Sequence, residues 1–132
     1  MTQQQILVEI GSGELIDKIT ILQIKSERMS DAAKLANVRL ELSELSAARD
    51  ASLPASDELE ALSAQLKGIN EALWVIEDDI RACEAKKDFG EKFIALARAV
   101  YVTNDQRAAV KKQINLLTGA KIIEEKSYTE FE

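Results

Sequence analysis

The sequence has no histidine, one cysteine, one proline and five glycines in 132 residues. Without histidine there is no His-based catalytic triad, no imidazole acid or base and no His-containing zinc site. The lone cysteine, Cys83, excludes a disulfide framework and indicates a reduced, cytoplasmic setting. The scarcity of glycine and proline, together with 46% hydrophobic and 30% charged residues, indicates a folded chain rich in helix.

The chain also lacks a long apolar run and an excess of positive charge. No window approaches the ~20 apolar residues of a membrane span, and the stretch from Met1 to Gln5 lacks the basic region of a signal peptide. The formal net charge is −6, from 23 acidic and 17 basic residues. Nucleic acids and anionic membranes select clustered Lys and Arg, so we expect neither as the main partner.

A line of apolar residues in the middle of the chain is the clearest pattern. Its members recur at alternating intervals of three and four residues, which places them along one side of a supercoiled helix. The line is about 36 Å long at roughly 1.5 Å per residue, and it requires another helix to cover it. Its residues are Leu59, Leu62, Leu66, Ile69, Leu73, Ile76, Ile80 and Cys83.

Two long helices are predicted, over residues 14–48 and 57–87. No Gly or Pro occurs between Glu14 and Ala48, Pro54 lies in the turn between the helices, and Ser56 is placed to cap the second helix. So short a turn predicts an antiparallel hairpin. The residue numbers of each contacting pair would then add up to about 104, so Leu42 would contact Leu62 and Val38 would contact Leu66.

Two shorter helices are expected after the hairpin. The first has apolar residues between Phe93 and Tyr101, and the second begins at Thr103, where the spacing to Gln106 is that of a capping box, and ends near Gly119. Short extended segments are expected at both ends, over residues 5–10 and 120–132. The predicted fold is therefore mainly α, as a single helical domain spanning residues 1–132.

Three patterns associated with specific chemistry are weak. Gly11, Ser12 and Gly13 before a helix resemble a phosphate-binding loop, but the acidic residues that follow would repel an anion. The carboxylates of residues 77–79 could bind a divalent cation, but the predicted register places no second acidic pair opposite them. The Ile16-Asp17 pair followed by cations is only superficially like the first helix of chorismate mutases. We therefore expect no metal, no cofactor and no catalytic residue.

A polar cluster at the predicted turn between the third and fourth helices is the best candidate for a ligand site. It mixes aromatic, amide and cationic groups, which suits a small ligand that carries a phosphate or a sugar. The alternative, which we favour, is a capped turn whose cations lie on a solvated face. The cluster comprises Arg98, Tyr101, Asn104, Asp105, Arg107, Lys111 and Lys112.

Three ordered motifs resemble a family of small, uncharacterised bacterial and phage proteins, a domain of unknown function sometimes associated with glycosyltransferases and tetratricopeptide regions. The motifs are Gly13–Leu22 (GELIDKITIL), Phe93–Asp105 (FIALARAVYVTND) and Ile123–Tyr128 (IEEKSY). The resemblance implies no reaction. It does imply that the polar residues of the motifs are better candidates for a shared site than the apolar line, and that any link to glycan assembly is one of association.

These patterns favour a helical interaction or accessory module that forms a homodimer and has a possible protein partner. Enzymatic activity is left open but not favoured. The alternative is a binding protein or an enzyme with a site for a small phosphate- or sugar-bearing ligand near residues 98–112. The residues expected to line such a site are Glu14, Asp17, Lys18, Arg98, Tyr101, Asn104, Asp105, Arg107 and Tyr128.

Overall fold

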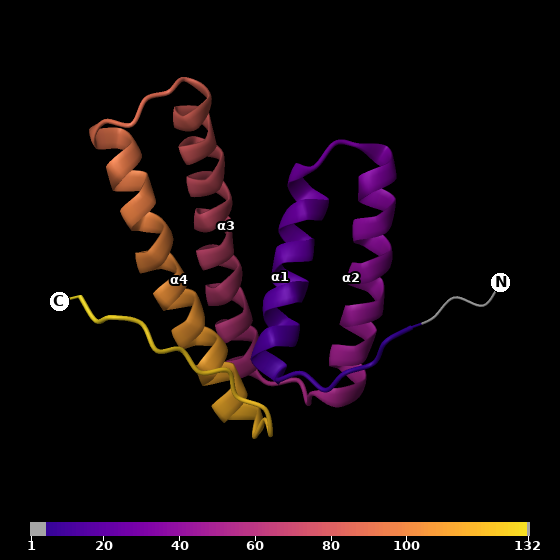
Figure 1. The fold of residues 1–132 in the computed structure, drawn as a ribbon. Coiled ribbons are helices and arrows are strands. Elements are labelled where there is room, and N and C mark those ends of the chain that lie inside the picture. Colours follow the sequence, from indigo (N-terminus) through magenta and orange to yellow (C-terminus); the bar gives the residue numbers. More distant parts are fainter. Residues whose placement is uncertain (1–4, 132) are drawn as a thin grey trace.

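The computed structural model describes residues 5–131 and contains four α-helices (Figure 1). They are α1 (Ser12–Arg28), α2 (Ala32–Ser52), α3 (Asp57–Ala85) and α4 (Glu91–Thr118). No β-strand is present among residues 5–131, so the mainly α fold is confirmed. The helices form two hairpins, α1–α2 and α3–α4, and α1 joins them by packing against both α3 and α4.

Three of the helix ends have a local explanation. The Ser56 hydroxyl accepts a hydrogen bond from the backbone N–H of Leu59 at 3.0 Å, which is the predicted cap of α3. Asp31 caps α2 in the same way, by accepting from the N–H of Lys34 at 3.0 Å. Gly119 ends α4 with a left-handed backbone, at a φ of 67°, that glycine adopts without a steric penalty.

The predicted helix over residues 14–48 is wrong as a continuous element. Met29 and Asp31 have extended backbones, with ψ angles of 149° and 119°, and the chain reverses between them. Asp31 supplies its own helix cap, which gives the chain a stable way to restart after the break. The first half of the expected rod therefore becomes α1, and the second half returns beside it as α2.

This reversal overturns the predicted register. Helices α1 and α3 begin at the same end of the molecule and run in the same direction (Figure 1). Within residues 5–131, α2 packs along α1 alone and not beside α3, so the predicted pairing of Val38 with Leu66 does not form. The apolar line of α3 is instead covered by α4 and α1, and Asn70 contacts Asp17 and Thr20 of α1.

The two shorter helices that were predicted are one continuous helix. Thr103 and Gln106 lie inside α4, so the capping-box spacing does not mark a helix start. The buried side of the first part continues into the second at helical intervals, through Asn104, Arg107, Lys111 and Ile114. With one uninterrupted inner face and no Gly or Pro, nothing ends the helix before Gly119.

The apolar core lies where α1 crosses the α3–α4 hairpin. Leu42, Leu45, Leu53, Leu62 and Ile69 pack against it while remaining partly exposed. None of the four described helices has a stretch apolar and long enough to cross a bilayer. The buried members of the core cluster are Leu15, Ile16, Ile19, Leu59, Leu66, Val110 and Ile114.

The start of α1 approaches the backbone of α4 so closely that only glycine fits. A Cβ atom on Gly13 would lie 2.3 Å from the carbonyl oxygen of Lys111. We expect Gly13→Ala to lower the free energy of unfolding by about 1–3 kcal/mol, because helix backbones must separate to admit the methyl group. Urea unfolding followed by circular dichroism measures the change.

Gly90→Ala is the matched control. A Cβ atom there would meet only the side-chain oxygen of Asp88, at 3.3 Å, and that side chain is exposed. Gly90 is the N-cap residue of α4, where alanine is less favourable than glycine, so the control should lower the free energy of unfolding by no more than about 1 kcal/mol. Equal stabilities of the two variants would contradict the close approach.

Candidate functional site

A buried ion pair joins the first helix to the last. Asp17 on α1 is 1% exposed, and Arg107 on α4 is partly buried. The guanidinium of Arg107 donates from Nε to Oδ1 of Asp17 at 2.9 Å and from Nη2 to Oδ2 at 2.5 Å. This two-pronged geometry is the strongest that an arginine and a carboxylate form, and it fixes α1 against α4.

Helix α3 completes the environment of the carboxylate. The Nδ2 atom of Asn70 donates to Oδ1 of Asp17 and to the hydroxyl oxygen of Thr20, each at 2.9 Å. Thr20 in turn donates to the backbone carbonyl of Asp17 at 2.8 Å. Three helices therefore meet at one carboxylate, and each polar group there has a partner.

The ionisation of Asp17 follows from these contacts. Burial raises the pKa of its carboxyl group, while hydrogen bonds from Arg107 and Asn70 and the charges of Arg107 and Lys111 lower it. The lowering outweighs the burial, so the pKa lies below its ordinary value and the group is charged at neutral pH. The hydrogen bond to Asp17 correspondingly raises the pKa of Arg107.

A second ionic layer lies one turn away, around Lys111. Its Nζ atom is 2.7 Å from Oε2 of Glu14 and 3.5 Å from Oε2 of Glu124. Lys18 approaches Glu14 at 3.6 Å, and Lys126 approaches Glu124 at 3.5 Å. The positive charge of Lys111 lowers the pKa of Glu124. A cavity of about 250 Å³ opens beside this layer, lined by Glu14, Asn104, Arg107, Ala108, Lys111, Glu124 and Lys126.

The structure brings together five of the nine residues predicted for the site. Glu14, Asp17 and Lys18 of α1 meet Asn104 and Arg107 of α4, where Oδ1 of Asn104 accepts from Nη1 of Arg107 at 3.5 Å. The turn that was expected to gather the α4 residues does not exist, since all of them lie on one helix. Their convergence with α1 comes from helix packing.

The other four predicted residues lie elsewhere. Arg98 and Asp105 are exposed on α4. The ring of Tyr101 packs edge-on against Phe131, with centroids 5.2 Å apart. Tyr128 is 75% exposed, and its ring lies 5.7 Å from Nζ of Lys126.

Sequence reasoning missed the asparagines of the site. Asn70 lies beside the apolar line of α3, and Asn115 lies on the buried side of α4. Oδ1 of Asn115 accepts from the backbone N–H of Gly13 at 2.8 Å and from the hydroxyl of Ser12 at 3.3 Å. The amide that a phosphate would need is thus taken by a side chain of the same protein. For Asn70 the sequence offered one signal, which is a polar residue directly beside the apolar line of α3.

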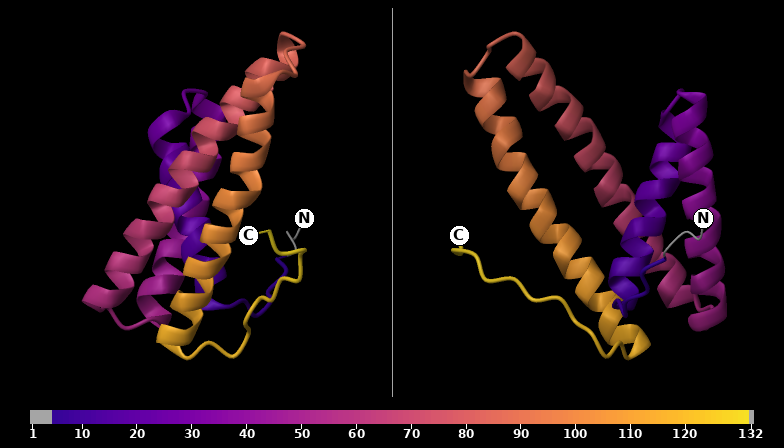
Figure 2. Two further views of the ribbon diagram at one scale, coloured as in Figure 1. Left: turned by 90° about the vertical axis from the view of Figure 1, so that its left-hand side faces the viewer. Right: turned by 45° about the vertical axis from the view of Figure 1, so that its right-hand side comes forward.

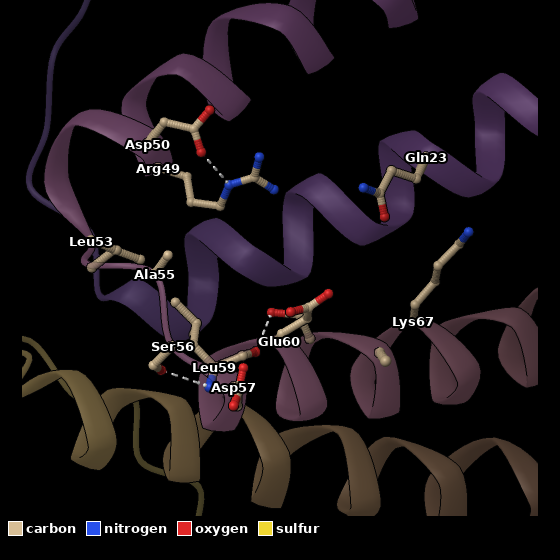
Figure 3. A pocket seen from close by; sticks show the side chains of 12 residues that line it. Gln23, Arg49, Asp50, Leu53, Ala55, Ser56, Asp57, Leu59, Glu60 and Lys67 are labelled. Atoms are coloured by element: carbon tan, nitrogen blue, oxygen red, sulfur yellow. Dashed lines mark hydrogen bonds and ion pairs between the residues drawn. The ribbon is translucent and has the colours of Figure 1, made fainter.

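A larger concavity lies at the α2–α3 turn and contains none of the predicted residues (Figure 3). Its volume is about 610 Å³. The cations on its wall are already paired, Arg49 with Asp50 at 3.0 Å and Lys67 with Glu27 at 2.9 Å. It therefore offers no unpaired cation to bind an anionic ligand, and the carboxylates of Asp57 and Glu60 on the same wall would repel one.

The arrangement of acidic residues differs from the one expected. The predicted register, which kept the carboxylates of residues 77–79 away from other acidic side chains, is wrong. Within residues 5–131, however, no three or more Asp, Glu, Cys or His side chains lie close enough together to bind a metal ion. Glu77 approaches Arg81 of its own helix at 3.1 Å. The polar groups near Asp17 thus bind one another and hold three helices in place.

The Asp17–Arg107 pair should make stability depend on pH. Arg107→Met leaves a charged carboxylate buried, so we expect a loss of about 3–5 kcal/mol at neutral pH. In the unsubstituted protein the lowered pKa of Asp17 contributes stability above the unfolded value of about 3.9, and this contribution is lost as the pH falls through the folded pKa.

Without Arg107 the pKa of Asp17 rises, so the variant loses less stability on acidification and the difference between the two proteins shrinks below about pH 4. Urea unfolding at neutral and acidic pH measures the difference. Arg98→Met, at an exposed position of the same helix, is the control and should cost little. A difference that is constant across pH would contradict the assignment.

Comparison with known proteins identifies a family without assigning an activity. No curated protein and no solved structure matches the chain. A model for a family of unknown function, DUF6165, matches residues 6–131, which include all four helices and both ionic layers. This protein therefore belongs to the DUF6165 family.

Proposed function

We propose that this protein is a helical interaction module that acts as a cytoplasmic homodimer and not as an enzyme. One observation carries the proposal. The α3–α4 hairpin is covered by α1 on one face, and its opposite face carries a patch of small apolar side chains that is largely exposed. In the left view of Figure 2, α3 and α4 lie side by side in front of α1 and α2.

Helical spacing defines this outer face. On α3, Gly68, Ala72 and Val75 recur at intervals of four and three residues, away from Asn70, which contacts α1. On α4, a second row follows the same intervals. Val75 is 46% exposed and Val102 is 40% exposed. The face therefore consists of Gly68, Ala72, Val75, Ala95, Ala99 and Val102, and the same spacing continues it into the polar residues Asp79 and Gln106.

Gly68 supports a close helix contact at this face. A glycine inside a helix costs about 1 kcal/mol relative to alanine. A Cβ atom at Gly68 would meet nothing within 4 Å, so packing within this chain gives no reason for the glycine. The backbone of a second copy, packed directly on the helix there, supplies one.

A second copy fits the shape of the face. Two antiparallel hairpins placed face to face form a four-helix bundle, and a two-fold axis lets the same patch serve both copies. In such a dimer α1 and α2 of each copy would lie on the outside of the bundle. Each helix of the central bundle would then be covered on both sides.

The polar groups of the site support a role other than catalysis. Within the described residues, no buried side-chain nitrogen or oxygen is without a hydrogen-bond partner. The Ser12 and Thr118 hydroxyls, which are the nearest hydroxyl groups to the start of α1, hydrogen-bond to each other. A catalytic nucleophile needs an adjacent base, and neither hydroxyl has one.

Val75→Glu tests the dimer. The substitution places a charge at the centre of the outer face, and we expect the protein to change from twice the 14.6 kDa chain mass to a single chain mass. Light scattering coupled to size exclusion measures the mass, and circular dichroism verifies that the helices remain.

Leu40→Glu is the control, because Leu40 is 63% exposed on α2, outside the outer face. This variant should keep the dimer mass. The proposal would be contradicted if the unsubstituted protein had the mass of one chain at all concentrations. It would also be contradicted if the Val75→Glu variant remained dimeric.

The cavity beside Lys111 supports a second candidate, the binding of a small phosphate- or sugar-bearing ligand. Three cations and two carboxylates line it, but one of the cations, Arg107, is already paired with Asp17. The lining is therefore close to neutral and selects anions weakly. A link to glycosyltransferases stays a prediction from the resemblance, and it makes a nucleotide sugar the sensible probe.

We expect inorganic phosphate and UDP-glucose to leave the melting temperature unchanged. A ligand present at a hundredfold excess over its dissociation constant would stabilise the fold by about 2.7 kcal/mol, which thermal denaturation detects readily. Asn104→Ala is the informative variant, because Asn104 lines the cavity and its contact with the ion pair is a long hydrogen bond of 3.5 Å from Arg107. A dose-dependent increase that disappears in Asn104→Ala would favour the ligand site over the module.

A further inference from the structure

The C-terminal segment, residues 120–131, folds back along α4. After the left-handed Gly119, Glu124 approaches Lys111, Glu125 approaches Lys112, and Phe131 reaches Tyr101. As the segment advances, its contacts move toward the start of α4, so it runs antiparallel to the helix (Figure 1). We call residues 120–131 the tail.

The surface under the tail is one side of α4. Tyr101, Ala108 and Lys112 are separated by seven and four residues, which places them in a row, and Lys111 lies next to that row. We call these four residues the α4 strip. It lies on a different side of the helix from Val102 and the outer face proposed for the dimer.

The tail and the α4 strip are complementary in charge and shape. Nζ of Lys112 lies 3.4 Å from both carboxylate oxygens of Glu125. The ring of Phe131 meets Tyr101 edge-on, at an interplanar angle of 82°. The tail therefore shows what this strip recognises, namely carboxylates at the end with the lysines and an aromatic ring at the end with the tyrosine.

The tail is nevertheless loosely attached. Phe131 is 51% exposed, and the side chain of Glu125 is 71% exposed. Two cavities, of about 190 and 250 Å³, are lined jointly by tail and α4 residues, including Glu124 and Lys111. Exposed ion pairs contribute ~0–1 kcal/mol each, so a competing segment needs little free energy to displace the tail.

We infer that the α4 strip is a docking surface for an acidic, aromatic peptide segment of a partner protein, and that the chain's own tail occupies this surface as an internal competitor. The partner segment carries adjacent carboxylates and, several residues later, an aromatic side chain. Displacement of the tail frees Lys112 and the ring of Tyr101, which are already 49% and 44% exposed, from their contacts with Glu125 and Phe131. This inference goes beyond the proposed dimer and does not depend on it, because the outer face lies elsewhere on α4.

The experiment uses the full chain with an opened tail. Glu125→Lys combined with Phe131→Ala removes the two outer attachments of the tail and leaves the helices unaltered, which circular dichroism verifies. The probe is a fluorescent peptide with the sequence of residues 120–132, AKIIEEKSYTEFE. We expect the opened variant to bind the probe about tenfold more tightly than the unsubstituted protein, because the internal competitor is gone.

Two controls locate the binding. Adding Lys112→Glu and Tyr101→Ala to the opened variant should weaken probe binding by about tenfold, because both ends of the α4 strip are lost. Adding Lys92→Glu, at an exposed position in the first turn of α4, should leave probe binding unchanged. A scrambled peptide of the same composition should bind no better to the opened variant than to the unsubstituted protein.

Three results would overturn the inference. One is a folded, opened variant that shows no saturable binding of the probe. Another is probe binding that is indifferent to Lys112→Glu and Tyr101→Ala. The third concerns a variant with Tyr101→Cys and Phe131→Cys in a Cys83→Ser background, and it is a disulfide that forms mainly between two chains. The α4 strip would then bind the tail of a second copy and not a partner protein.

Discussion

The buried carboxylate of Asp17 is the constraint on which the arrangement of the helices depends. A charged group that is 1% exposed must be compensated within the protein, because burying it without partners costs far more than one apolar contact returns. Its compensation comes from Arg107 of α4 and Asn70 of α3 together. Apolar packing is non-directional, so it would allow α1 to slide along the α3–α4 hairpin. These hydrogen bonds fix both the axial position of α1 on the hairpin and its rotation about its own axis.

The start of α1 reinforces the same joint through contacts of a different kind. Gly13 lets the two backbones approach, and Asn115 then accepts from its amide. One turn along, Lys111 links Glu14 of α1 to Glu124 of the tail. Several polar residues of the three predicted motifs, namely Glu14, Asp17, Asn104 and Glu124, therefore lie at a structural joint. Their charges are used to hold helices together, which is why a cluster that resembles a ligand site from its composition carries so little unpaired charge.

Helix α4 illustrates how one helix can serve several partners. Its inner side packs on α1 and α3 through Val110 and Ile114, a second side carries the tail, and a third is exposed in a row of small side chains. Because the three sides of α4 differ in this way, the apolar pattern of residues 93–118 predicts two helices where the structure has one. Only the inner side follows a single apolar pattern, and that side includes Asn104, Arg107 and Lys111, which interrupt it with polar groups.

The sequence by itself determined the helical class, the second long helix with its Ser56 cap, the turn at Pro54 and the glycine that ends α4, because these depend on interactions between neighbouring residues. It also indicated that Glu14, Asp17, Lys18, Asn104 and Arg107 belong together. Only the tertiary structure decided the break between Met29 and Asp31, the parallel course of α1 and α3, and the partners of Asp17. An apolar line specifies that a helix must be covered but not by which helix or in which direction. That choice was made by a few long-range contacts, above all those of Asp17 with Asn70 and Arg107, whose separations of 53 and 90 residues no local pattern encodes.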